Sequence, residues 1–113
     1  MGGVHDEVWK LYRGDELIAD LVLAGGEFPW LNARVNPHSG LEEVRELFAE
    51  ELRRLDHIDD DMDGWEAVYG AIRSTVSLRY PDGREVPEFL LHIDADQAWW
   101  RWSDEPFDSQ QPR

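Results

Sequence analysis

Apolar and polar residues alternate along the first third of the chain, a pattern typical of half-buried β-strands. Residues 8–13 and 16–23 alternate in this way on either side of Gly14 and Asp15. A glycine at the first central position suits a two-residue type II′ turn, because this turn needs a positive φ there. A further alternating segment covers residues 31–36. We therefore expect three antiparallel strands in this part of the chain.

The middle of the chain changes to a helical spacing. Apolar residues recur every three or four positions over residues 41–55, which predicts an amphipathic helix. Ser39 and Glu42 have the spacing of a capping box at the start of this helix. A second apolar stripe over residues 65–72 predicts another helix, for which Asp63 is the expected N-cap.

The last third returns to alternation over residues 76–80, 89–93 and 98–102. A hairpin with its loop at residues 95 and 96 places all of its apolar pairs on one face. Those pairs are Phe89 with Trp102, Leu91 with Trp100, and Ile93 with Ala98. The opposite face then carries His92 beside Trp99, and a shift by one residue would mix apolar with polar positions.

The order of three strands, two helices and three strands predicts an α+β fold. The simplest architecture is one antiparallel sheet, in the order β-β-β-α-α-β-β-β, with the helix pair packed on one face. The 113 residues match the size of one domain. We expect a single α+β domain over residues 1–103 and a short polar C-terminal tail over residues 104–113.

The chain is strongly acidic, with a formal net charge of −14 from 25 acidic and 11 basic residues. Such a charge repels nucleic acids and anionic membranes, and it attracts basic proteins or cations. Solubility alone is an equally good explanation of it. The absence of cysteine and of a signal-peptide pattern favours a cytoplasmic protein without disulfides or a membrane span.

Residues 59–64 resemble the first half of an EF-hand calcium loop. Asp59, Asp61 and Asp63 occupy positions 1, 3 and 5, and Gly64 occupies position 6. Position 12, where a bidentate glutamate completes the site, is Gly70. These three aspartates are therefore a weak metal candidate, and we favour an acidic loop between two helices, without a metal or other cofactor.

Motifs for catalysis are missing from the sequence. No serine lies in a GxSxG context, no histidines have HExxH spacing, and no phosphate-binding glycine loop occurs. We therefore expect a protein without enzymatic activity. The six tryptophans cannot all be fully buried in so small a core, so the remainder either half-cover the core or include one that contacts a ligand or partner.

Residues 87–107 read PEFLLHIDADQAWWRWSDEPF. With residues 27–30 and 47–52, this segment resembles a family of small acidic hypothetical proteins of high-GC actinobacteria to which no activity is assigned. The resemblance implies a bacterial cytosolic origin and transfers no functional residue. In size, acidity and α+β order the chain is also similar in kind to immunity proteins that neutralise basic toxins, an analogy of class alone.

Together these observations predict a non-enzymatic domain that binds a basic protein partner. The residues predicted to contact the partner are Asp59, Asp60, Asp61, Asp63, Trp99 and Arg101. The alternative is a small-molecule-binding or hydrolytic pocket on the second sheet face, formed by His92, Trp99 and Arg101. His92 and Trp99 would equally form a packed pair beneath a loop, which we favour. An exposed edge strand is compatible with a homodimer as well as with a monomer.

Overall fold

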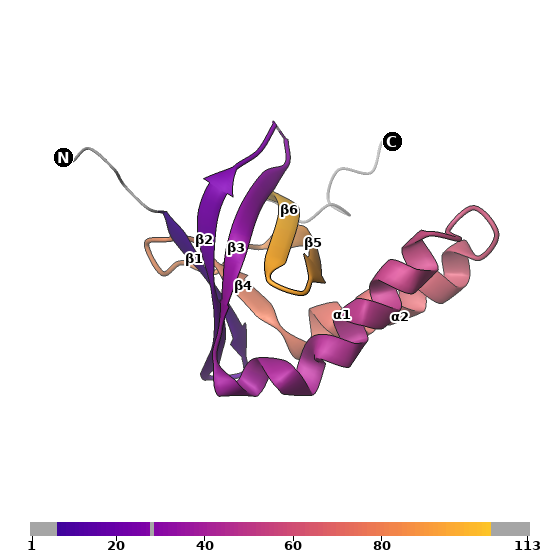
Figure 1. The fold of residues 1–113 in the computed structure, drawn as a ribbon, viewed down its shortest axis with the longest axis horizontal. Helices are drawn as coiled ribbons and strands as arrows, with labels where there is room; N and C mark the ends of the chain where they lie inside the picture. The colour runs from indigo at the N-terminus through magenta and orange to yellow at the C-terminus, as the bar shows by residue number, and fades with distance from the viewer. Residues whose placement is uncertain (1–6, 28, 105–113) are drawn as a thin grey trace.

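The computed structural model describes residues 7–27 and 29–104, and it confirms the predicted α+β class. Strands and helices follow one another in the predicted order (Figure 1). Of the predicted tail, only Asp104 belongs to the described residues. The elements are β1 (Val8–Arg13), β2 (Glu16–Gly25), β3 (Leu31–Pro37), the 3-10 turn η1 (Ser39–Leu41), α1 (Glu42–Leu55), α2 (Met62–Thr75), β4 (Ser77–Arg79), β5 (Glu88–Asp94) and β6 (Gln97–Ser103).

The six strands form one antiparallel sheet in the order β4-β1-β2-β3-β6-β5. The predicted register of the C-terminal hairpin is confirmed, with Leu91 opposite Trp100 and His92 opposite Trp99. Pairing of β3 with β6 joins this hairpin to the N-terminal strands. The sheet therefore combines the two ends of the chain, and the helices lie in the connection between them.

The sheet is strongly curled around its apolar face. The ring of Trp9 on β1 lies 5.4 Å from that of Trp100 and 5.9 Å from that of Trp102, both on β6. In a flat sheet, three strand spacings would separate these strands by about 14 Å. The curl encloses a core in which Trp100 and Leu11 are completely buried.

The helix pair lies along β5, at one edge of the sheet, and projects away from it (Figure 1). The Tyr69 hydroxyl of α2 donates to the Phe89 carbonyl at 2.7 Å and accepts from the Leu91 amide at 2.9 Å. Burial raises the pKa of Tyr69, so this hydroxyl remains protonated. The Tyr69 side chain thus provides hydrogen-bond partners for two backbone groups at the edge of β5, which has no neighbouring strand on that side.

Both predicted helix caps differ in the structure. Asp61, rather than Asp63, caps α2, and its side chain accepts from the Gly64 amide at 3.0 Å. The first helix starts after η1 and has no side-chain cap. A Cβ on Gly40 would lie 2.6 Å from the Ile18 side chain, so packing against β2 determines how the chain enters α1. Tertiary contacts have therefore replaced the capping box.

Neither α1 nor α2 is long and apolar enough to cross a lipid bilayer, and they are the two α-helices of the described residues.

We expect Tyr69→Phe to lower the free energy of unfolding by about 1–3 kcal/mol, because it leaves a buried amide and a buried carbonyl of β5 without their partner. Urea denaturation measures this loss. Tyr12→Phe is the matched control, since no described residue is hydrogen-bonded to the Tyr12 hydroxyl. Equal stabilities of the two variants would contradict the role of Tyr69.

Candidate functional site

Glu51 of α1 and His92 of β5 are both buried, and their ionisable side chains face each other across the helix–sheet junction. Glu51 is 0% exposed and His92 is 3% exposed. The Nδ1 atom of His92 lies 3.0 Å from one carboxylate oxygen of Glu51, and the indole of Trp65 donates to the other at 2.7 Å. Both oxygens therefore have partners, as a buried carboxylate requires.

The imidazole of His92 is packed among aromatic rings. Trp99, its neighbour on β6, lies 5.4 Å away between ring centroids. Trp30, from the turn between β2 and β3, stacks on it at 5.9 Å with an interplanar angle of 27°. His92 and Trp99 thus form a packed pair beneath the turn that carries Trp30.

The turn itself is fixed by a close backbone approach. Gly26 has a φ of 134°, and a Cβ there would lie 2.4 Å from the Trp30 carbonyl oxygen. The Trp30 amide donates to the Glu27 carbonyl at 2.7 Å. Only glycine fits this position without moving the backbone, so Gly26 determines where Trp30 lies.

A carboxylate that orients a histidine is also part of many catalytic triads. Here the imidazole is covered by Trp30 and Trp99, and it is too little exposed to contact a substrate directly. The arrangement instead connects α1, α2 and β5. We call Glu51, His92 and Trp65 the buried polar cluster.

In the acidic loop between the helices, Asp61 makes contacts that stabilise the fold. Asp61 caps α2 and also accepts from Arg54 at 3.1 Å. Within residues 7–27 and 29–104, no group of three or more histidine or acidic side chains could hold a metal ion. Asp59 and Asp63 are exposed and form no ion pair within the described part of the chain.

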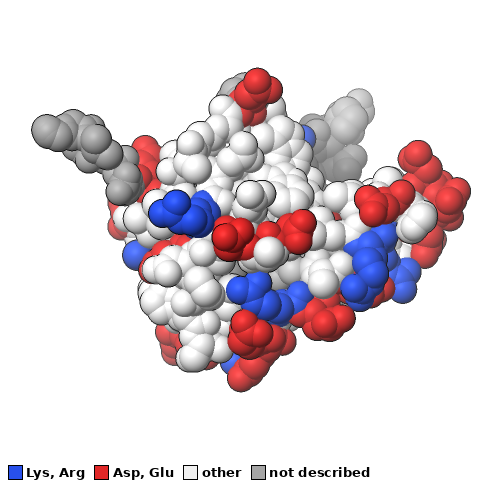
Figure 2. Space-filling model, in the orientation of Figure 1, with Lys and Arg blue, Asp and Glu red and all other residues white. Residues whose placement is uncertain are grey.

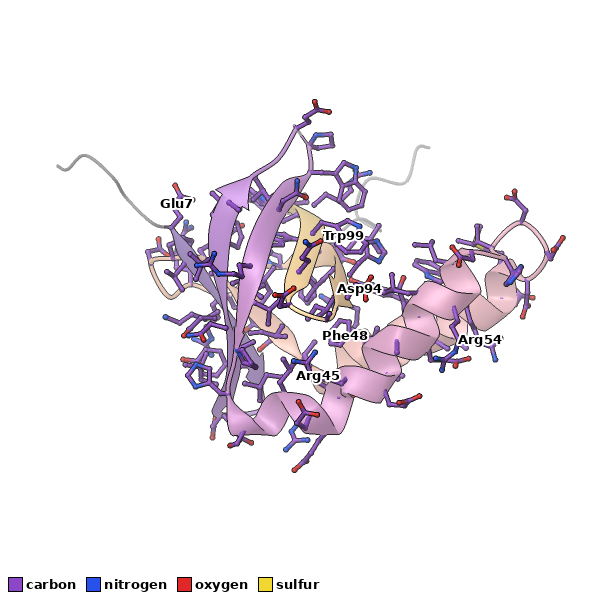
Figure 3. All side chains as sticks on the ribbon, in the orientation of Figure 1. Glu7, Arg45, Phe48, Arg54, Asp94 and Trp99 are labelled. Carbon is purple, nitrogen blue, oxygen red and sulfur yellow. The ribbon has the colours of Figure 1, made fainter. Side chains whose placement is uncertain are left out.

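The predicted partner-binding residues lie in two separate regions. The aspartates belong to the far end of the helical hairpin, where acidic side chains gather on the face shown in Figure 2. Trp99 and Arg101 lie on β6, in the sheet. Figure 3 shows this separation through Trp99 on the sheet and Arg54, which contacts Asp61, on the hairpin.

The three residues of the predicted pocket do not line one cavity. His92 is buried, and Trp99 lines a cavity of about 450 Å³ together with Arg34. Arg101 lines a different and larger cavity of about 660 Å³, which also includes Trp9, Trp30 and Trp102. We call this larger cavity the aromatic cleft.

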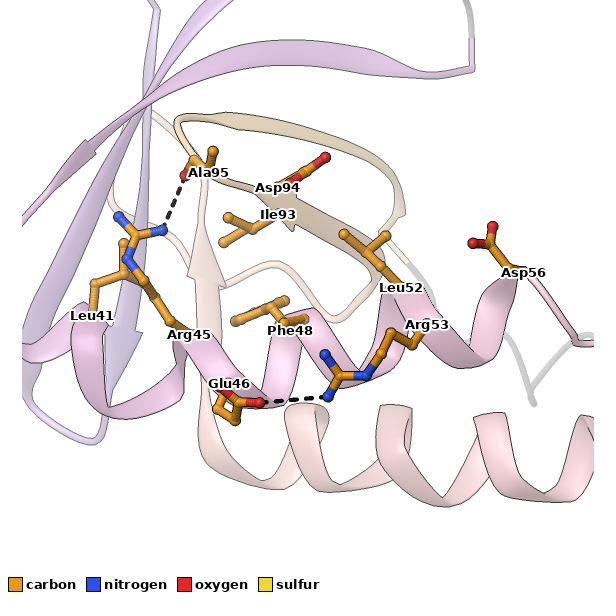
Figure 4. Close-up of a pocket in the computed structure, with 11 residues that line it drawn as sticks. Leu41, Arg45, Glu46, Phe48, Leu52, Arg53, Asp56, Ile93, Asp94 and Ala95 are labelled. Atoms are coloured by element: carbon orange, nitrogen blue, oxygen red, sulfur yellow. Dashed lines mark hydrogen bonds and ion pairs between the residues drawn. The ribbon is translucent and has the colours of Figure 1, made fainter.

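A further hollow lies where α1 meets the turn between β5 and β6 (Figure 4). This α1 groove has a volume of about 460 Å³. Its apolar residues are Leu41, Phe48, Ala49, Leu52, Ile93 and Ala95. Leu52 and Ile93 approach it from facing elements, as Figure 4 shows. Charged side chains surround this apolar centre.

The basic residues around the groove are already paired. Arg45 donates to Glu42 at 2.9 Å and to the Ala95 carbonyl at 3.0 Å. Arg53 pairs with Glu50 and Glu46, and its hydrogen bond to Glu50 is the main cause of the lowered pKa of that carboxyl.

The acids Asp56 and Asp94, in contrast, are exposed and have no ion-pair partner within the described part of the chain. The groove therefore combines an apolar centre with two available negative charges.

Sequence reasoning missed Glu51, Trp65 and Trp30 as a connected group. One signal was present, because Glu51 lies on the apolar stripe of α1 between Phe48 and Leu55. A charged residue at such a position predicts a buried polar partner. The identity of that partner depends on tertiary contacts between elements far apart in the sequence.

Comparison of the chain with protein-family models, with curated proteins and with solved structures finds no match.

We expect Glu51→Ala to lower the free energy of unfolding by about 3–5 kcal/mol, because His92 and the Trp65 indole lose their buried acceptor. Glu51→Gln should lose less, since its amide oxygen still accepts one hydrogen bond. Urea denaturation gives both values. The control Glu66→Ala removes an exposed carboxylate of α2 and should change the stability by no more than about 0.5 kcal/mol. A Glu51→Ala protein as stable as this control would refute the role of the cluster.

Proposed function

We propose that the protein is a non-enzymatic interaction domain that binds a basic protein partner through the α1 groove. The observation that supports this most is the combination found in the groove, where an apolar centre is flanked by Asp56 and Asp94, two acids with no ion-pair partner among the described residues.

The apolar centre provides affinity for one partner side chain. Leu52 is half-buried, whereas Phe48 and Ile93, which also line the groove, are buried. Burying a leucine-sized side chain contributes about 1.5–3 kcal/mol. The groove therefore suits an apolar anchor residue.

The charges provide specificity. Lysine or arginine residues beside such an anchor would pair with Asp56 and Asp94 without breaking an existing ion pair, because Arg45 and Arg53 already have acidic partners. A partner with acidic residues there would be repelled. The groove therefore selects a basic segment.

The net charge extends this preference beyond the contact region. Because the formal net charge of the chain is −14, its electrostatic field attracts a basic protein from a distance and repels nucleic acids. Asp59 and Asp60 are exposed on the projecting hairpin and add to this field without lining the groove. The absence of cysteine supports a reducing, cytoplasmic setting for the interaction.

We expect affinity capture from a lysate of the native host to recover a basic protein at low salt and to release it at high salt, because salt screens charge pairs. Mass spectrometry identifies the captured protein. If no basic protein binds at low salt, the proposed function is wrong.

With the captured partner, we expect the double variant Asp56→Asn/Asp94→Asn to bind about tenfold or more weakly, since a tenfold change corresponds to about 1.4 kcal/mol shared by two charge pairs. Calorimetric titration measures the affinity. The matched control Asp15→Asn/Glu66→Gln removes the same charge from exposed positions outside the groove. Equal affinities of the two double variants would place the partner elsewhere.

We expect Asp59→Asn/Asp60→Asn to slow association at low salt by a few-fold and to leave dissociation unchanged, because these charges act at a distance. Asp61 is kept in this variant since it caps α2. Stopped-flow mixing with the captured partner measures both rates. A faster dissociation would instead show direct contact with the hairpin end.

A further inference from the structure

The aromatic cleft lies between the start of β1, the turn before β3 and the end of β6. Its volume is about 660 Å³, which is within the range of small-molecule sites. Three indoles line it, from Trp9, Trp30 and Trp102, together with the half-buried Leu23 and Leu31. Trp102 is 39% exposed, so one of these indoles is accessible from solvent.

The three indoles are held in position by other parts of the fold. Trp9 is only 4% exposed, and its ring lies 5.9 Å from that of Trp102. Trp30 stacks on His92, whose imidazole is fixed by Glu51. A ligand would therefore meet a site that is already formed, which lowers the entropic cost of binding.

Two charged side chains line the cleft, those of Glu7 and Arg101. Side chains alternate along a strand, so Glu7 points to the same face as Trp9, while Arg101 points away from the face of Trp102. The Leu23 amide donates to the Glu7 carbonyl at 2.8 Å, so the strand pairing extends to Glu7. The carboxylate of Glu7 therefore accompanies the indoles of the cleft.

A tyrosine ring beside these indoles, that of Tyr80, already contacts a cation of the protein, the guanidinium of Arg84. The ring of Tyr80 lies 5.3 Å from those of both Trp9 and Trp102, and the guanidinium of Arg84 lies over it at 4.7 Å. Indoles attract cations more strongly than phenol rings do. With Glu7 nearby and a net charge of −14, the cleft is suited to positive charge.

We propose that the aromatic cleft binds a small organic cation with an apolar body, such as a substituted ammonium ion. The apolar body lies against Leu23 and Leu31, and the cation lies near the indole faces and the Glu7 carboxylate. This ligand is a free small molecule. Its site shares no residue with the α1 groove, so it does not depend on the proposed partner.

Three probes of equal ring size test the proposal at pH 7, namely 1-naphthylmethylammonium, 1-naphthalenemethanol and 1-naphthaleneacetate. Calorimetric titration should give at least a tenfold lower Kd for the ammonium than for the alcohol, and the weakest binding for the carboxylate. The proposal is overturned if the ammonium does not bind at millimolar concentration, or if the alcohol or the carboxylate binds as tightly.

Two variants locate the site. Glu7→Gln should weaken binding of the ammonium about threefold or more and leave the alcohol unchanged, whereas Trp102→Leu should weaken both probes. The control Asp15→Asn removes one carboxylate at an exposed turn outside the cleft. Near-ultraviolet circular dichroism verifies that each variant is folded. Equal effects of Glu7→Gln and Asp15→Asn would show that only the net charge matters and would overturn the assignment to this cleft.

Discussion

The carboxylate of Glu51 is the interaction on which the rest of the structure depends. It lies completely buried, and its two oxygens are hydrogen-bonded to the His92 imidazole and the Trp65 indole. A buried carboxylate is very costly without such partners, so Glu51 can be buried only together with the His92 imidazole and the hydrogen bond from the Trp65 indole. These two hydrogen bonds thereby connect α1 with both α2 and β5.

Both proposed binding regions follow from this junction. Because the helices are held along β5, their far ends project from the sheet, and one face of α1 remains partly uncovered as the α1 groove. On the other side of the junction, His92 supports Trp30, which forms part of the aromatic cleft. The cluster therefore positions both regions while contacting no ligand itself.

Local patterns were sufficient for the elements of the fold but not for their junction. The register of the last hairpin was predictable because a shift by one residue would have exposed Leu91 and Trp100. The helix caps were not, since Asp61 and Asp63 are equally good caps by residue type. The pairing of Glu51 with His92 joins positions 41 residues apart, and no periodicity encodes it.

The most direct test is nuclear magnetic resonance of the His92 imidazole in the intact protein. Because an ionised carboxylate only accepts hydrogen bonds, we expect the proton of the hydrogen bond between His92 and Glu51 to lie on Nδ1, where burial protects it from water. We predict a ring Nδ1–H signal at neutral pH that exchanges slowly with solvent. An unprotonated Nδ1, or a proton that exchanges as fast as that of a free imidazole, would contradict the buried polar cluster and the fold built around it.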